Sequence, residues 1–162
     1  MSARIDLWIN FLDDLPFRDG SVDLFYSFHV IEHLPERHLP AHFAAMFRAL
    51  KPGGGIRIGG PHAESAARKF LAGDTKWFSD FPIKHDSIGG RFSNFLFCAG
   101  EHLSALTPSF LTELAEGAGF VDVTVRLPIR ESELVGREIL DSEYEWDFET
   151  PHSLVIEARK PG

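Results

Sequence analysis

Cysteine is scarce in this sequence, and long apolar runs are absent from it. Cys98 is the only cysteine among 162 residues, so no internal disulfide can form and no Cys-x-x-Cys pair can hold zinc. We expect Cys98 to be a small core residue. No apolar run reaches the roughly 18 residues that a membrane span needs, and the first residues lack a basic stretch followed by an apolar signal core. These absences predict a cytoplasmic protein with no membrane partner.

Positive charge is also in short supply. The 16 Lys and Arg residues are outnumbered by 24 Asp and Glu residues, which gives a formal net charge of -8. Because Lys and Arg are the residues that neutralise phosphates, this balance argues against a nucleic-acid partner. The composition, with 44% hydrophobic and 12% aromatic residues, is globular and predicts a single domain over residues 1–162.

Strand-like and helix-like segments alternate along the chain. A helix over 107–118 has the clearest signals, with Thr107 as N-cap, Pro108 at the first helical position and Gly119 after the end. The stretch 74–106 is rich in Phe and Gly without a clear period, so we expect an irregular insertion. The other predicted helices are 39–50 and 63–73, and the predicted strands are 4–11, 22–28, 55–60, 120–127 and 152–160.

The pentapeptide HVIEH, at 29–33, has the spacing of a zinc site in which two His ligands lie one helical turn apart. It begins where the apolar strand 22–28 ends, and Pro35 follows two residues after His33. Proline disfavours the α conformation in the preceding residue, so a helix carrying both His residues would end almost where it began. We therefore predict that HVIEH holds no zinc and that the protein has no metal site. His38 and His42 lie opposite the apolar stripe of helix 39–50 and are expected on a solvated face.

Several motifs in a fixed order resemble one enzyme family. They are LPFRDGSVD at 15–23, IEHL at 31–34 and LKPGG at 50–54, and the likeness continues through the "aGF" helix end at 118–120. This pattern resembles the class I S-adenosylmethionine-dependent methyltransferases, particularly small bacterial members. The resemblance implies an α/β, Rossmann-like doubly wound sheet, here N-terminally truncated to about five strands, mostly parallel with an antiparallel last strand. It implies a methyltransferase, or its C-terminal part, acting on an unknown small-molecule acceptor.

The same resemblance implies where S-adenosylmethionine would bind. The family holds the adenine with an acidic side chain and an apolar residue after the strand that matches 4–11. Phe11 occupies the family's usual acidic position, so Asn10 or Asp13 is the alternative contact for the adenine. A solvated turn is an equally weighted interpretation of Asp13 and Asp14. The implied cofactor-binding residues are Asp13, Asp14, Leu15, Ser27, Phe28 and His29.

The family's opening strand, glycine-rich turn and ribose-binding acid have no counterpart here, since about three residues precede the first predicted strand. The chain is then either a fragment of a longer enzyme or a protein that lost the cofactor half. In either case we expect weak or no cofactor binding by this chain alone. The missing strands would leave the apolar strand 22–28 with an open edge, which favours a homodimer.

Methyl transfer is an in-line displacement, so the protein positions a nucleophile, excludes water and in some cases removes a proton. The candidate catalytic residues are His29, His33 and His102, and the candidate substrate-binding residues are His62, Arg91, Asn94 and His102. The alternatives are a turn residue for His102 and a structural ion pair for Arg91. Glu143, Trp146 and Phe148 either cover a pocket or form a surface connection. The alternative function is a non-catalytic module that binds a partner; a zinc hydrolase is a distant third.

Overall fold

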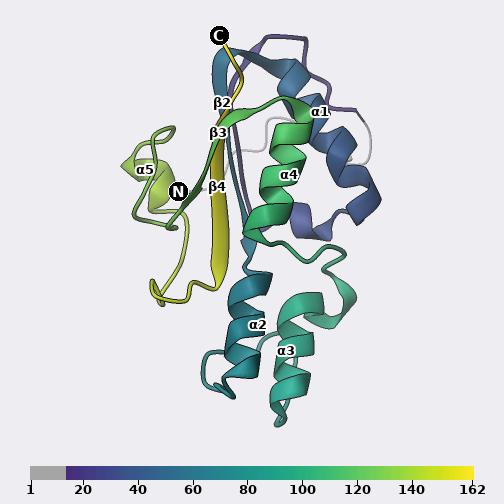
Figure 1. Ribbon diagram of the computed structural model, residues 1–162, viewed down its shortest axis with the longest axis vertical. Helices are drawn as coiled ribbons and strands as arrows, with labels where there is room; N and C mark the ends of the chain where they lie inside the picture. Colours follow the sequence, from purple (N-terminus) through teal and green to yellow (C-terminus); the bar gives the residue numbers. More distant parts are fainter. Residues whose placement is uncertain (1–13) are drawn as a thin grey trace.

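A four-stranded sheet forms the centre of the protein, whose structure, a computed structural model, describes residues 14–162 (Figure 1). The sheet has the order β1-β2-β4-β3. Its strands are β1 (Val22–Phe28), β2 (Leu50–Pro61), β3 (Val121–Arg126) and β4 (Ser153–Arg159). Each strand predicted between 22 and 160 is confirmed, and β2 begins earlier than expected, directly after the helix before it.

The strand directions agree with the predicted topology within the described residues. β1 and β2 are parallel, and β4 is antiparallel to both β2 and β3. The antiparallel last strand is therefore confirmed. β1, β2 and β3 therefore run in the same direction, as expected, and β4, which lies between β2 and β3, makes the described sheet mixed. The predicted strand 4–11 lies outside the described residues.

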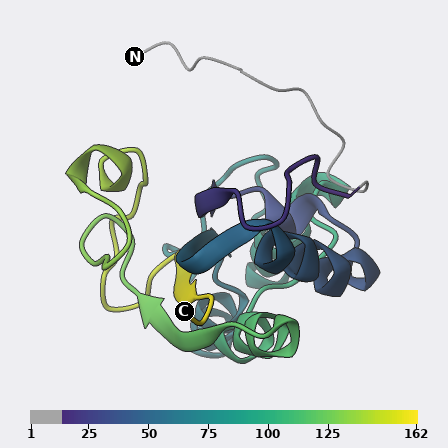
Figure 2. The ribbon, with the colours of Figure 1, turned by 90° about the horizontal axis from the view of Figure 1, so that it is seen from above.

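Two helices, α1 (Leu39–Ala49) and α4 (Pro108–Ala118), cover one face of the sheet, while the segment carrying the short α5 (Arg137–Leu140) lies on the other (Figure 2). The predicted cap of α4 is confirmed: Thr107 accepts a hydrogen bond from the Phe110 amide, and Gly119 has a φ of 102°. The sequence did not predict α5.

The core lies between the sheet and the α1–α4 layer. Ile56 and Ile58 on β2 face Phe43 of α1 and Leu111 of α4, and all four side chains are fully buried. Truncating one of them to alanine would leave a cavity and cost about 2–5 kcal/mol. This layer fixes the position of β1 and β2, whose ends carry the residues discussed below.

The helices α2 (Ala63–Leu71) and α3 (Ile88–Phe97) extend beyond the end of the sheet (Figure 1). The prediction of a wholly irregular 74–106 was wrong, because α3 occupies its middle. Ser87 caps that helix, and Phe92 and Phe95 pack in a second cluster around Trp77 and Phe78. Gly89 and Gly90 in the first turn of α3 lower its helix propensity, so the helix is hard to recognise from the sequence. Among residues 14–162, no helix is both long and apolar enough to cross a membrane.

Candidate functional site

Three strand ends meet at one edge of the sheet. β1 ends at Phe28 and β2 ends at Pro61, while β4, which runs the other way, begins there at Ser153. The register pairs Phe28 with Gly59 and Pro61 with Ser153. The carboxyl ends of parallel strands are where doubly wound proteins bind ligands. A ligand-binding or catalytic site is therefore expected among the side chains at this edge.

A cavity of about 320 Å³ opens at this edge. Imidazole and aromatic rings dominate its wall, and they come from segments far apart in the sequence. Three of the predicted site residues, His29, Asn94 and His102, line it. The other lining residues are Pro61, Ser79, Phe81, Pro82, Phe95, Cys98, Tyr144, Trp146, His152 and Ser153. The expectation that Cys98 is a core residue was wrong, because it is only partly buried and faces this cavity.

His29 directly follows β1 and lies in the left-handed region, with a φ of 56°. This conformation is uncommon for a residue other than glycine, and such residues are enriched at functional sites. Its Nε2 lies 3.0 Å from the Ser153 hydroxyl and its Nδ1 lies 3.3 Å from Glu32 Oε1. The ring also stacks on Tyr144, with centroids 5.2 Å apart and planes 13° apart. His29 is thus held on three sides.

His102 reaches the same cavity from the segment after α3. Its Nδ1 lies 3.2 Å from the Leu96 carbonyl, and its ring contacts that of His33 with centroids 5.1 Å apart. Burial lowers the pKa of His102, and the opposing charge of Glu32 does not outweigh that effect. A neutral imidazole in a cavity can accept a proton or bind a metal ion.

His152, which the sequence analysis missed, lies at the cavity wall. Its ring stacks on Trp77 with centroids 4.0 Å apart, its Nε2 lies 2.7 Å from the Trp77 carbonyl, and its Nδ1 lies 3.1 Å from Glu145 Oε1. Burial works to raise the pKa of Glu145, but hydrogen bonds from His152 and from the Ser153 amide lower it. This pair ties the start of β4 to the second aromatic cluster.

The remaining predicted substrate residues have structural contacts. Arg91 donates to the Phe78 carbonyl at 3.2 Å and forms an ion pair with Asp80 at 2.8 Å. This contact agrees with the alternative interpretation of Arg91 as a structural residue. Asn94 donates to the Phe81 carbonyl at 2.7 Å while lining the cavity. His62 does not line it: its ring caps α2 through the Ser65 amide, and burial lowers its pKa.

A second hollow, of about 420 Å³, runs along β1. Phe25 and Ser27 contribute from one face of the strand, and Tyr26 and Phe28 from the other, so the hollow follows the strand's edge. Within the described residues β1 pairs only with β2, which leaves that edge without a described partner. The hollow's other lining residues are Leu15, Phe17, Val30, His42 and Met46. The expectation of a solvated His42 was wrong, because it is buried and burial lowers its pKa.

This hollow contains three of the residues expected to bind S-adenosylmethionine, namely Leu15, Ser27 and Phe28. Its apolar walls suit the adenine ring, and Ser27 Oγ is buried without a hydrogen-bond partner among residues 14–162. No carboxylate lines it in the described part of the chain. Asp14 instead pairs with Arg48 at 3.1 Å, and Asn10, Phe11 and Asp13 lie outside the described residues. The residues present fit the adenine end of the cofactor and not its ribose.

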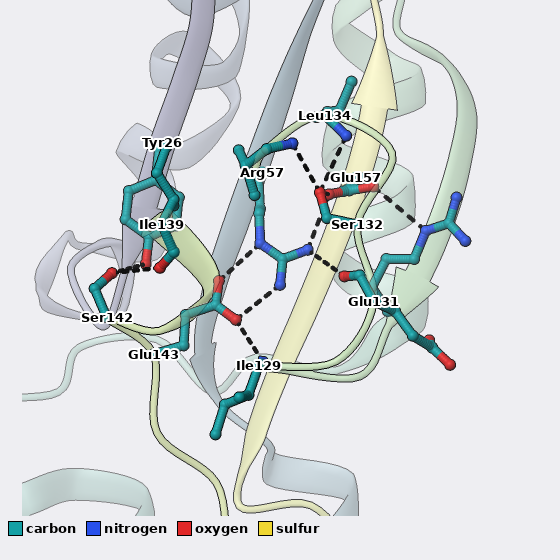
Figure 3. Close-up of polar contacts among 12 residues, drawn as sticks. Tyr26, Arg57, Ile129, Glu131, Ser132, Leu134, Ile139, Ser142, Glu143 and Glu157 are labelled. Atoms are coloured by element: carbon teal, nitrogen blue, oxygen red, sulfur yellow. Dashed lines mark hydrogen bonds and ion pairs between the residues drawn. The ribbon is translucent and has the colours of Figure 1, made fainter. Parts of the chain in front are cut away.

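The late loop, 127–152, is anchored by a buried ion cluster (Figure 3). The Arg57 guanidinium makes two hydrogen bonds to Glu143, at 2.7 and 2.8 Å, and one to Glu157 at 2.9 Å. Glu143 therefore does not cover a pocket as one reading had it. Trp146 does line the cavity, while Phe148 lies under the Arg130 guanidinium, 3.5 Å from the ring centroid.

Comparisons with known proteins agree with this architecture. Residues 5–58 match the family described as "Methyltransferase domain", which is about a third of the chain. An S-adenosylmethionine-dependent methyltransferase from Archaeoglobus fulgidus is 17% identical, with a TM-score of 0.56 over 95% of this chain and 66% of its own. A Thermotoga maritima methyltransferase described as a possible histamine N-methyltransferase is 19% identical, with a TM-score of 0.55 over 95% of this chain and 62% of its own.

A possible exported protein from Bordetella parapertussis gives a TM-score of 0.58 at 17% identity, over 95% of this chain and 43% of its own. No curated protein matches the sequence. The chain therefore spans only 43% to 66% of the length of these solved structures. The class I S-adenosylmethionine-dependent methyltransferase fold expected from the motifs is confirmed, as a part of that fold.

Proposed function

We propose that this chain is the acceptor-binding part of an S-adenosylmethionine-dependent methyltransferase that acts on a small molecule. The observation that carries the proposal is the 320 Å³ cavity at the ends of β1 and β2, in the methyltransferase fold, with His29 and His102 in its wall. Cavities of this size suit small molecules, and the fold places ligands at this edge. The hollow along β1 lies beside it and is the seat expected for the adenine of the cofactor.

The chain's own residues would orient the acceptor and take its proton. The cofactor, when bound, supplies a methyl group on a sulfonium as the electrophile. His29 is the base we favour, because the Ser153 hydroxyl lies 3.0 Å from its Nε2, Glu32 lies 3.3 Å from its Nδ1 and Tyr144 stacks on its ring. The Ser153 hydroxyl can turn away when an acceptor hydroxyl or amine takes its place near His29 Nε2. The rings of Tyr144 and Trp146 would exclude water from the same space.

The test is transfer of a radiolabelled methyl group from millimolar S-adenosylmethionine to a panel of small hydroxyl and amine compounds. We expect at least one compound to be methylated, and replacing His29 by alanine to slow that reaction by about 10²–10⁴-fold, the usual contribution of a general base. His38→Ala is the matched control, since His38 does not line the cavity. Equal rates in the two variants would contradict the role of His29, and no transfer to any compound would contradict the activity.

A non-catalytic, partner-binding module is the second candidate. The hollow along β1 and the lack of a carboxylate in its described wall favour it, because a partly exposed apolar strand whose edge has no partner among residues 14–162 can pair with another chain. A stable complex that forms through β1 in a protein without methyl transfer would support this candidate over the first.

A further inference from the structure

Three potential metal ligands converge beside the acceptor cavity. They are Glu32 and His33, in the turn after β1, and His102, after α3. One ligand atom from each lies within 4.8 Å of the others. This cluster differs from the expectation of no metal site, which considered only His29 and His33 on a helix. The structure instead forms a 3₁₀ turn over Ile31–His33 and brings His102 to it.

The hydrogen bonds of both imidazoles leave a lone pair for a ligand. His33 Nδ1 lies 2.9 Å from the Glu101 carbonyl, and His102 Nδ1 lies 3.2 Å from the Leu96 carbonyl. A carbonyl only accepts, so each Nδ1 carries the hydrogen and each neutral ring keeps its lone pair on Nε2. A backbone carbonyl on the far nitrogen is the usual support of a metal-binding histidine.

Glu32 is the member of the cluster whose carboxylate is buried without hydrogen-bond donors among the described residues. Its side chain is 1% exposed, and neither carboxylate oxygen has a hydrogen-bond donor within residues 14–162. The nearest cationic candidates are His29 at 3.3 Å and His33 at 3.9 Å, both measured to Oε1. Burying a carboxylate without donors is costly unless a cation accompanies it. A Cβ at Gly60 would lie 3.1 Å from Oε2, so the glycine permits this close approach.

The backbone holds the two halves of the cluster together. The Glu32 carbonyl accepts hydrogen bonds from the Leu103 amide at 2.7 Å and from the Ser104 amide at 3.1 Å. The Ser104 hydroxyl donates to the Leu34 carbonyl at 2.7 Å. These bonds fix the segment that carries His102 against the turn that carries Glu32 and His33, without using any of the three ligand atoms.

We propose that Glu32, His33 and His102 bind a divalent transition-metal ion, with Zn²⁺ as its representative. Two imidazoles and one carboxylate form a donor set that suits first-row transition metals better than Mg²⁺ or Ca²⁺, which prefer oxygen ligands. Zinc–ligand bonds of about 2.1 Å place tetrahedral ligands roughly 3.4 Å apart. Side-chain rotations that move the ligand atoms by about an ångström would therefore bring them to zinc-binding distances.

The position of this site explains what the ion would do. Three protein ligands leave a coordination position open, as in catalytic zinc sites. His33 is exposed, and His102 also lines the 320 Å³ cavity, so the ion would lie at the cavity's edge within reach of an oxygen of the bound acceptor. The site does not depend on methyl transfer, and with His102 as a ligand the proton would go to His29.

The experiment uses the full chain, purified without a His tag and treated with a chelator. Titration with Zn²⁺ against a chromogenic chelator should show one equivalent bound at micromolar affinity or better, and Co²⁺ should give the visible absorption of a four- or five-coordinate site. His33→Ala, Glu32→Gln and His102→Ala should each weaken binding by at least about tenfold. His33 is the most informative position, because its exposed side chain can be removed with little effect on folding.

Two controls keep the result specific. His38→Ala removes a histidine outside the cluster, and Cys98→Ser removes the nearby thiol; both should bind Zn²⁺ like the original chain. Unfolding of each metal-free variant separates a lost ligand from a lost fold. The proposal would be overturned by the absence of stoichiometric Zn²⁺, by unchanged affinity in His33→Ala, or by loss of binding in Cys98→Ser.

Discussion

Replacing Arg57 by methionine tests whether the buried ion cluster holds the late loop to the sheet. The side chain of Arg57 is 0% exposed, and so is that of Glu143. Burial alone would lower the pKa of Arg57, but the hydrogen bonds and charges of Glu143 and then Glu157 raise it above its ordinary value. Arginine is in any case always charged, so methionine removes a cation from the protein interior at every practical pH.

The two carboxylates differ in what they retain. Among residues 14–162, Glu143 keeps only the Ile129 amide, at 2.8 Å, whereas Glu157 keeps the Glu133 amide, the Ser132 hydroxyl and the Arg126 side chain. Most of the cost therefore comes from Glu143. Breaking one side of a buried ion pair typically costs about 3–5 kcal/mol. We expect Arg57→Met to lower the free energy of unfolding by that amount.

Urea unfolding followed by circular dichroism measures the change, and limited proteolysis reports on the loop. New cleavage should fall within 127–152, the segment drawn around the cluster in Figure 3. Lys51→Met is the control, because the Lys51–Asp23 pair is exposed and such a pair contributes about 0–1 kcal/mol. If Arg57→Met costs no more than Lys51→Met, the cluster does not stabilise the fold and the reasoning fails.

Three further predictions concern the cofactor, the pH dependence of stability and the oligomeric state. Calorimetric titration of the chain with S-adenosylmethionine should show weak or no binding, because the described hollow offers no acid for the ribose; a one-to-one complex at low-micromolar affinity would contradict this. Burial lowers the pKa of His62, so below about 6.5, the ordinary value for histidine, the unfolded chain takes up a proton that the folded chain does not, and stability falls as the pH falls. His62→Asn keeps a side chain that can cap α2 and should show a smaller loss of stability between neutral and mildly acidic pH in urea unfolding; an unchanged pH profile would rule out this contribution. Light scattering coupled to size exclusion should show a homodimer through the edge of β1, whereas a monomer at every concentration would mean that this edge is closed within one chain.

The sequence determined the elements whose signals are local. Thr107, Pro108 and Gly119 marked the ends of α4, because capping depends on residues within one turn of each helix end. The apolar run of β1 and the Pro35 that follows HVIEH predicted a strand and then no α-helix, and both are confirmed. The motifs between 15 and 54 predicted the methyltransferase fold through their resemblance to that family, whose motifs occur in the same order.

Only the tertiary structure decided which distant residues meet. Arg57 contacts Glu143, and Glu32 contacts the segment of His102, through pairings that no local pattern encodes. The place of β4 between β2 and β3 was likewise decided by the structure, since strand order is set by how the whole chain packs. The candidate metal site has the same origin: its ligands come from two segments that are held together by backbone hydrogen bonds between residues distant in the sequence.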